Sequence, residues 1–71
     1  MRGMRFSKGL DTELQTFFGI NRESCSAKCK ITYCIVTSFF ENDQECWLGI
    51  KGIEGALSFQ YDDSAVSEIF P

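Results

Sequence analysis

The run from Lys28 to Phe40 (KCKITYCIVTSFF) is the longest apolar, β-branched and aromatic stretch of the sequence. Successive side chains of a strand point to opposite sides, so such a run has two faces. One face is almost entirely apolar and consists of Cys29, Ile31, Tyr33, Ile35, Thr37 and Phe39; the other mixes Lys28, Lys30, Thr32 and Ser38 with Cys34, Val36 and Phe40. This alternation is typical of a β-strand with one face in the core. The sequence therefore predicts one long strand over 28–40, around which the domain is built.

A hairpin with a defined register is predicted to follow this run. The polar stretch 41–44 (ENDQ) has the composition of a turn, and residues 46–50 alternate as a second strand. A slip of one residue would turn Trp47 toward the core, so the apolar pattern favours the register with Phe39 opposite Cys46. The same register places Thr37 beside Leu48, Ile35 beside Ile50 and Ser38 opposite Trp47.

Two short helices are predicted to flank the strands. The first spans 10–19, begins with a capping-box pattern and ends at a glycine, and its apolar stripe is Leu10, Leu14, Phe17 and Phe18. The second follows the possible caps Asp62 and Asp63, and its apolar side is Ala65, Val66, Ile69 and Phe70. Residues 20–27 form a polar connection, residues 57–61 alternate as a third strand, and Met4–Ser7 is a candidate for a short fourth one.

The expected fold class is therefore α+β. It consists of a three-stranded antiparallel meander, with the short N-terminal strand as an optional fourth, and of an N-terminal helix and a short C-terminal helix packed on one face. The chain of 71 residues has room for a single small domain, residues 1–71, and its 44% hydrophobic content argues against disorder.

Charge and the absence of long apolar segments set limits on partners and location. The formal net charge is −3, which does not favour nucleic-acid binding because counterion release rewards a basic surface. Residues 1–30 carry six basic and three acidic side chains, whereas residues 31–71 carry one basic and seven acidic ones. This asymmetry leaves room for a basic protein partner, or for a second copy docked head to tail. The first ten residues lack the apolar region of a secretory signal, and no stretch approaches the roughly 20 apolar residues of a membrane span. We therefore expect a cytoplasmic protein that does not enter the membrane.

The four cysteines, at positions 25, 29, 34 and 46, are expected to be reduced thiols, because disulfides are rare in the cytoplasm. Their spacing does not match the paired ligands of zinc modules. In the predicted strand, Cys29 and Cys34 point to opposite faces, and Cys29 lies about 33 Å from the neighbour of Cys46. We therefore predict no metal and no cofactor. We also predict no Cys34–Cys46 disulfide, because the alternation puts these two cysteines on opposite faces of the sheet. A Cys25–Cys29 pair under oxidation, and a thiol or zinc protein, remain as alternatives.

Catalytic chemistry has little support in this sequence. The chain has no histidine, which is the side chain that most often performs acid–base catalysis near neutral pH. Its carboxylates gather at 41–45 and 62–63, where turn and capping roles explain them. We therefore predict no catalytic residues and no enzymatic activity.

The second face of the predicted sheet supplies the candidate site. Three apolar side chains gather there beside three acidic residues of the turn: Val36, Phe40 and Trp47, with Glu41, Asp43 and Glu45. An aromatic patch with a charged rim is typical of interaction surfaces. The alternative is that the N-terminal segment covers the patch.

These observations predict a small acidic protein that acts by binding a macromolecule. Inhibitors, immunity or antitoxin-like proteins and accessory proteins of phages or mobile elements are of this kind. The expected partner is another protein or the chain itself, because the strand 28–40 is predicted to lie at a sheet edge and to pair in a homodimer. The alternative is a homodimer that encloses a small apolar ligand between its sheets.

Overall fold

The computed structural model describes residues 1–7, 13–51 and 58–70. Six elements follow one another in these residues: β1 (Arg2–Phe6), β2 (Glu13–Phe18), α1 (Arg22–Thr32), β3 (Val36–Phe40), β4 (Glu45–Lys51) and β5 (Phe59–Ile69). The strands form one sheet in the order β1-β5-β3-β4-β2, and every neighbouring pair is antiparallel.

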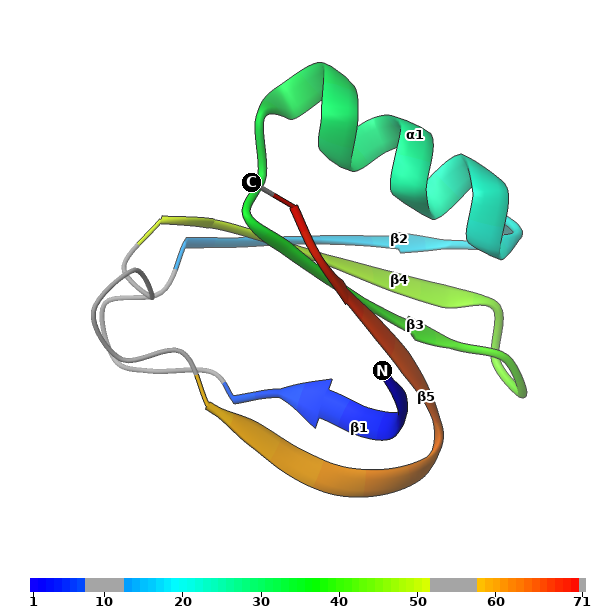
Figure 1. The fold of residues 1–71 in the computed structure, drawn as a ribbon. Coiled ribbons are helices and arrows are strands. Elements are labelled where there is room, and N and C mark those ends of the chain that lie inside the picture. Colours follow the sequence, from blue (N-terminus) through cyan, green and yellow to red (C-terminus); the bar gives the residue numbers. More distant parts are fainter. Residues whose placement is uncertain (8–12, 52–57, 71) are drawn as a thin grey trace.

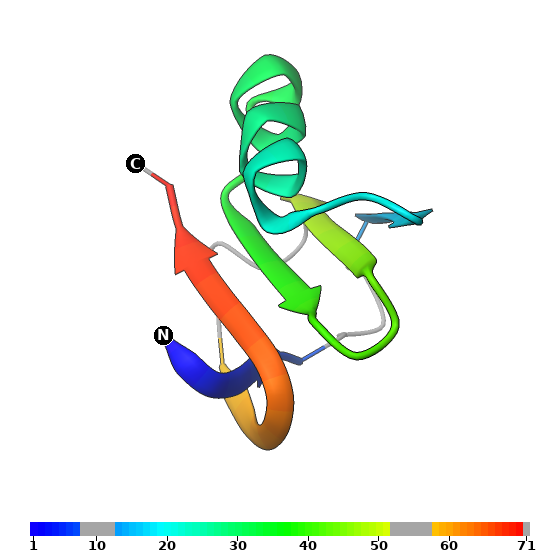
Figure 2. The same cartoon turned by 90° about the vertical axis from the view of Figure 1, so that its right-hand side faces the viewer.

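The sheet is strongly curved and carries the helix on one side only. α1 packs against β3 and β4 (Figure 1), whereas β1 and the first half of β5 curl beneath the opposite face of the same strands (Figure 2). The predicted three-stranded meander with two helices is therefore wrong. The described part of the chain is mostly β, with five strands and one helix.

Residues 13–18 form a strand, not the second half of the predicted helix. β2 pairs with β4 along its whole length, and Phe17 lies opposite Cys46. The helical spacing of Leu14, Phe17 and Phe18 was misleading, because the three side chains lie on different sides of a strand and Phe18 is exposed. Pairing with a strand that is 27 or more residues away overrides the local preference. The first part of the predicted helix, residues 10–12, lies outside the described residues.

The predicted strand 28–40 is wrong in its first half, because residues 22–32 form α1. The Asn21 side chain caps this helix by accepting a hydrogen bond from the backbone N–H of Ser24 at 2.8 Å. Only two helix side chains are buried, Cys25 and Cys29, which follow one another at a spacing of four. The alternation that continues through Ile31 therefore does not reflect burial: this side chain is exposed.

The predicted C-terminal helix is wrong as well, because residues 59–69 form the long strand β5. Asp62 does accept a hydrogen bond from the backbone N–H of Ser64, at 3.0 Å, but this bond supports a bend within the strand. Beyond the bend, β5 is buried on both faces, with Ala65, Val66 and Ser67 all in the core. Position 57 of the predicted third strand lies outside the described residues.

The hairpin of β3 and β4 has the predicted register. Phe39 lies opposite Cys46, Thr37 opposite Leu48 and Ser38 opposite Trp47, and residues 41–44 form the turn. The register differs at its open end, where the Ile35 N–H donates to the Gly49 carbonyl at 3.0 Å and the regular pairing begins at Val36. The candidate N-terminal strand also exists, as β1. Unlike the predicted strand 28–40, β3 is the central strand of the sheet.

Two apolar clusters fill the two sides of the sheet. The cluster beneath the helix consists of Cys25, Cys29, Cys34, Phe39, Cys46 and Leu48. The cluster on the other side is built on Phe6 and Val36, with Leu14, Ile35, Trp47 and Phe59 packed against it. β1 therefore contributes a fully buried side chain to the core.

A buried serine pair, Ser38 and Ser67, ties β1 to the middle of the sheet. The Phe6 N–H donates to the Ser38 hydroxyl at 2.9 Å, and the Ser67 hydroxyl donates to the Met4 carbonyl at 2.7 Å. The two hydroxyls are 2.7 Å apart. Because Ser67 has a single hydroxyl proton, Ser38 must be the donor between them. The pair thus satisfies one donor and one acceptor of the β1 backbone.

We expect Ser38→Ala to lower the free energy of unfolding by about 1–3 kcal/mol, because it leaves the buried Phe6 N–H without its partner. Urea unfolding of the parent and the variant measures this difference. Ser24→Ala is the matched control, since the Ser24 side chain is exposed and should change stability by less than about 0.5 kcal/mol. Equal stabilities of the Ser38 and Ser24 variants would contradict the structural role of the serine pair.

Candidate interaction surface

The six residues proposed from the sequence lie partly in the core and partly at the surface. Val36 is fully buried and Phe40 is only 7% exposed. Both side chains lie on the face that β1 covers. Glu41 and Asp43 are exposed in the β3–β4 turn, and Glu45 and Trp47 are partly exposed. The role of these residues in binding stays a prediction.

Trp47 is held by the side chains of neighbouring residues. The rings of Phe40 and Phe6 lie 4.7 and 5.8 Å away, and the Arg5 guanidinium lies 5.9 Å from the ring centre. Its indole N–H donates to the Glu45 carboxylate at 2.6 Å. These contacts fix Trp47 within the fold, so its position is explained without invoking a binding protein.

Acidic side chains of the β3–β4 turn and of the β5 bend lie at one end of the molecule, because the Glu41 N–H donates to the Ser64 carbonyl at 3.0 Å. Arg2 pairs with Glu41 at 2.8 Å. Hydrogen bonds from the Ser64 hydroxyl and N–H hold the pKa of Asp62 below its ordinary value, and the charge of Arg5 acts in the same direction. Among the described residues, no group of three or more His, Cys, Asp or Glu side chains is arranged to hold a metal ion.

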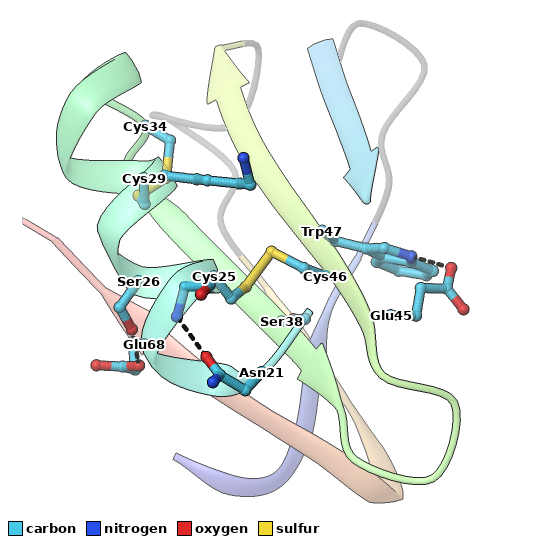
Figure 3. The surroundings of a disulfide bond; sticks show 12 residues. Asn21, Cys25, Ser26, Cys29, Cys34, Ser38, Glu45, Cys46, Trp47 and Glu68 are labelled. Atoms are coloured by element: carbon cyan, nitrogen blue, oxygen red, sulfur yellow. Dashed lines mark hydrogen bonds between the residues drawn. A yellow bond between two sulfur atoms is a disulfide. The ribbon is translucent and has the colours of Figure 1, made fainter. Parts of the chain in front are cut away.

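All four cysteines are paired in disulfides, so the expectation of reduced thiols is wrong for this structure. Cys25 of α1 is bonded to Cys46 of β4, with 5.7 Å between their Cα atoms, and Cys29 is bonded to Cys34, with 4.8 Å between theirs (Figure 3). Both separations lie within the normal range for disulfides. Cys34 and Cys46 are not bonded to each other, as predicted, but the predicted reason is wrong: both belong to the cluster beneath the helix, and Cys34 is bonded to Cys29, which was expected on the opposite face. The alternative Cys25–Cys29 pair is not formed.

Tyr33 stands out at the end of the helix. It is the C-terminal cap of α1 and has a left-handed backbone conformation, with φ 58°. This region favours glycine, and for other residues it costs about 1–2 kcal/mol. The Tyr33 side chain is 88% exposed, the largest exposed fraction among the large apolar side chains described. The conformation is therefore unfavourable, and the side chain gains little packing within the fold in return.

Beside Tyr33 the surface is hollowed. A pocket of about 300 Å³ is lined by Tyr33, Phe70, Lys30 and the Cys29–Cys34 disulfide. A second hollow of about 400 Å³ runs along the same side of α1 toward its N-terminus; it is lined by Arg22, Glu23, Ser26, Ala27, Lys30 and Glu68. The two hollows share Lys30. We call them together the α1–β5 groove.

The charges along this groove are only partly compensated. The Ser26 hydroxyl donates to the Glu68 carboxylate at 2.7 Å, which joins the helix to β5 across the groove (Figure 3). The two ion pairs formed among the described residues lie elsewhere, at Arg2–Glu41 and Arg5–Asp62. Lys30 is exposed next to the apolar pocket. The site therefore combines an apolar pocket with a positive charge at its rim.

The sequence contained one signal for this surface, the spacing of Cys25 and Cys29 behind a capping Asn21, which fits a helix ending near Tyr33. The left-handed conformation of Tyr33 cannot be recognised in the sequence, because the residue that usually indicates it at a helix end is glycine. No family model matches the chain, and no significant match was found among curated proteins or solved structures. Within the described residues, no helix has the length and apolar character needed to cross a membrane.

Proposed function

We propose that the protein acts by binding another protein, and that Tyr33 and the adjoining pocket form the contact. The observation that carries this proposal is the exposed aromatic side chain at a position where folding favours glycine. An unfavourable backbone conformation at a surface residue is typical of functional sites. Exposed tyrosines beside an apolar pocket are also enriched among the residues that dominate protein interfaces.

The partner we propose inserts an apolar or aromatic side chain between Tyr33 and Phe70 and places a carboxylate near Lys30. The pocket supports the first part, because its lining is apolar apart from Lys30. The exposed ammonium group supports the second, since an acidic group at the rim would steer the encounter and fix the orientation. The second hollow of the α1–β5 groove, which continues toward Arg22, gives room for a flanking segment of the partner chain.

The place of action that we propose is an oxidising environment instead of the cytoplasm expected from the sequence. Two disulfides support this location, because disulfides persist in extracellular, periplasmic or lumenal surroundings and are rare in the reducing cytosol. They also suit a domain of 71 residues, whose core alone supplies little stability.

Replacement of Tyr33 by glycine should separate stability from binding. We expect Tyr33→Gly to raise the free energy of unfolding by about 1 kcal/mol, because glycine adopts the left-handed conformation without strain. Thermal unfolding measures this gain. The matched control is Gln44→Gly, at an exposed turn residue that also has a left-handed conformation, with φ 50°. Both variants should be more stable than the parent, but only the first should lose its partner.

Photo-crosslinking identifies the partner. A benzophenone amino acid placed at position 33, in protein added to a native extract, should yield a defined crosslinked protein, and the same probe at the exposed position 42 should not. Unlabelled Gln44→Gly should compete for the crosslink, whereas unlabelled Tyr33→Gly should not. Equal competition by the two variants would show that Tyr33 is not the contact.

A further inference from the structure

Within the described part of the chain, the outer edge of β2 has no strand beside it. β2 pairs only with β4, and no other described strand lies beyond it (Figure 2). Proteins usually guard such edges with lysine, proline or a bulge. Residues 13–18 contain neither lysine nor proline, and the register of β2 shifts at its first step, between Glu13 and Leu14. The other edge strand is different. In β1, Gly3 has φ 83°, the register shifts between Arg2 and Met4, and the side chain of Arg2 is held by Glu41.

The hydrogen bonds show which backbone groups of β2 are open. In an antiparallel pair, successive positions alternate between facing the neighbouring strand and facing away from it. The Gly19 N–H donates to the Gln44 carbonyl at 2.9 Å, so position 19 faces β4. The register is regular from there back to Leu14. The N–H and C=O groups of Leu14, Thr16 and Phe18 therefore point away from β4, toward the open edge.

The side chains of these three residues lie on the face of the sheet opposite the helix. Leu14 packs partly against the cluster of Phe6 and Val36. Thr16 is exposed, and Phe18 is 69% exposed at the end of the strand. An open row of backbone donors and acceptors thus runs beside a large apolar side chain that the fold leaves uncovered.

We propose that a second copy of the chain pairs with this edge, β2 against β2, about a two-fold axis at Thr16. Outward-facing N–H and C=O groups at a sheet edge form hydrogen bonds with an added β-strand. The sequence of β2 is self-complementary in this register: Thr16 lies opposite the second copy's Thr16, and Leu14 lies opposite the second copy's Phe18. Each exposed Phe18 is then covered by a leucine.

The symmetric pairing keeps the two helices on the same side of one continuous sheet. Because three residues of each strand offer both a donor and an acceptor, the pairing forms about six backbone hydrogen bonds. An antiparallel isologous contact of this kind closes on itself and does not propagate into a fibre. This contact does not include Tyr33 or its pocket. A variant that abolishes the dimer should therefore still bind the proposed partner, and a variant that abolishes partner binding should still form the dimer.

Solution mass is the first test. The parent at high micromolar concentration should have twice the chain mass of 8.1 kDa. Thr16→Lys should halve this mass, because it places two like charges opposite each other at the axis. Asn42→Lys, with the same charge change at an exposed turn residue, should remain a dimer. If Thr16→Lys fails to fold, Phe18→Lys serves in its place. A monomeric parent would overturn the proposal.

Amide hydrogen exchange tests the register. In the parent dimer, the amides of Leu14, Thr16 and Phe18 should exchange slowly, and dilution to the monomer should accelerate them at least tenfold. The amides of Gln15 and Phe17, which face β4, should remain slow at both concentrations. A dimer in which the amides of Leu14, Thr16 and Phe18 exchange at the same fast rate as in the monomer would show that the copies meet elsewhere, and would overturn the proposed edge.

Discussion

Removal of the Cys25–Cys46 disulfide by the double change Cys25→Ala and Cys46→Ala should lower the free energy of unfolding by about 3 kcal/mol. This bond closes a loop with a sequence separation of 21 residues and fastens α1 to β4. The loss of conformational entropy in the unfolded chain gives this magnitude in the chain-entropy model. For a domain of this size, such a loss approaches the whole stability. Denaturant unfolding under non-reducing conditions measures the change.

The second disulfide provides the internal comparison. Cys29→Ala with Cys34→Ala opens a loop with a separation of only 5 residues, so the expected loss is about 2 kcal/mol. The order of the two effects is the informative result. If the short-loop pair matters more than the long-loop pair, the helix is not held on the sheet chiefly by the Cys25–Cys46 bond.

Phe6→Ala should lower the free energy of unfolding by about 3–5 kcal/mol, the usual range for a large buried aromatic side chain. Phe6 is fully buried, belongs to the cluster with Val36, and packs edge-on against Trp47. Because Trp47 contacts the deleted ring, its fluorescence should also change in the folded state of the variant. Urea unfolding followed by this fluorescence reports both effects.

The matched control for Phe6 is Ile31→Ala. Ile31 is also a large apolar residue, but it is 76% exposed on α1, so its truncation should change stability by less than about 0.5 kcal/mol. A Phe6 variant as stable as the Ile31 variant would show that β1 does not contribute to the core.

The β3–β4 hairpin could be predicted because its signals are local. The turn composition of 41–44 and the alternation on either side select one register, and the observed partners Phe39 and Cys46 agree with it. The neighbours of this hairpin could not be predicted in the same way. β2 comes to lie beside β4, and β5 beside β3, through contacts between distant parts of the chain. Such pairings leave no mark in a short window of sequence.

The sequence pattern does not indicate α1, because the buried face of this helix is narrow. A long amphipathic helix shows three or four apolar residues in every two turns, whereas α1 buries only Cys25 and Cys29. The Cys25–Cys46 disulfide fastens this narrow face to β4. At the same time, Ile31 and Tyr33 continue an alternation that suits a strand, although both side chains are exposed. Here burial and periodicity point in opposite directions.

The candidate surface illustrates the same limit. Trp47, Glu41, Asp43 and Glu45 could be placed near one another because all belong to a single hairpin. The cover over Val36 and Phe40 is different, because it comes from β1, which is more than 30 residues away in the sequence. The alternation predicts Tyr33 on the core face of a strand, whereas the side chain is exposed at the end of α1. Its left-handed backbone follows from the end of the helix, which the sequence pattern does not indicate.

The position of α1 on the sheet and the proposed oxidising location both depend on the Cys25–Cys46 and Cys29–Cys34 disulfides. Disulfide mapping of the unreduced protein tests these two bonds most directly. Combined cleavage after Lys and Glu separates all four cysteines, because a cleavage site lies between each cysteine and the next. These sites are Lys28, Lys30, and Glu41 with Glu45. We expect two linked pairs: peptide 24–28 bonded to 46–51, and peptide 29–30 bonded to 31–41. Free thiols throughout, or a bond between peptides 24–28 and 29–30, would contradict this pairing and the position of α1 on the sheet.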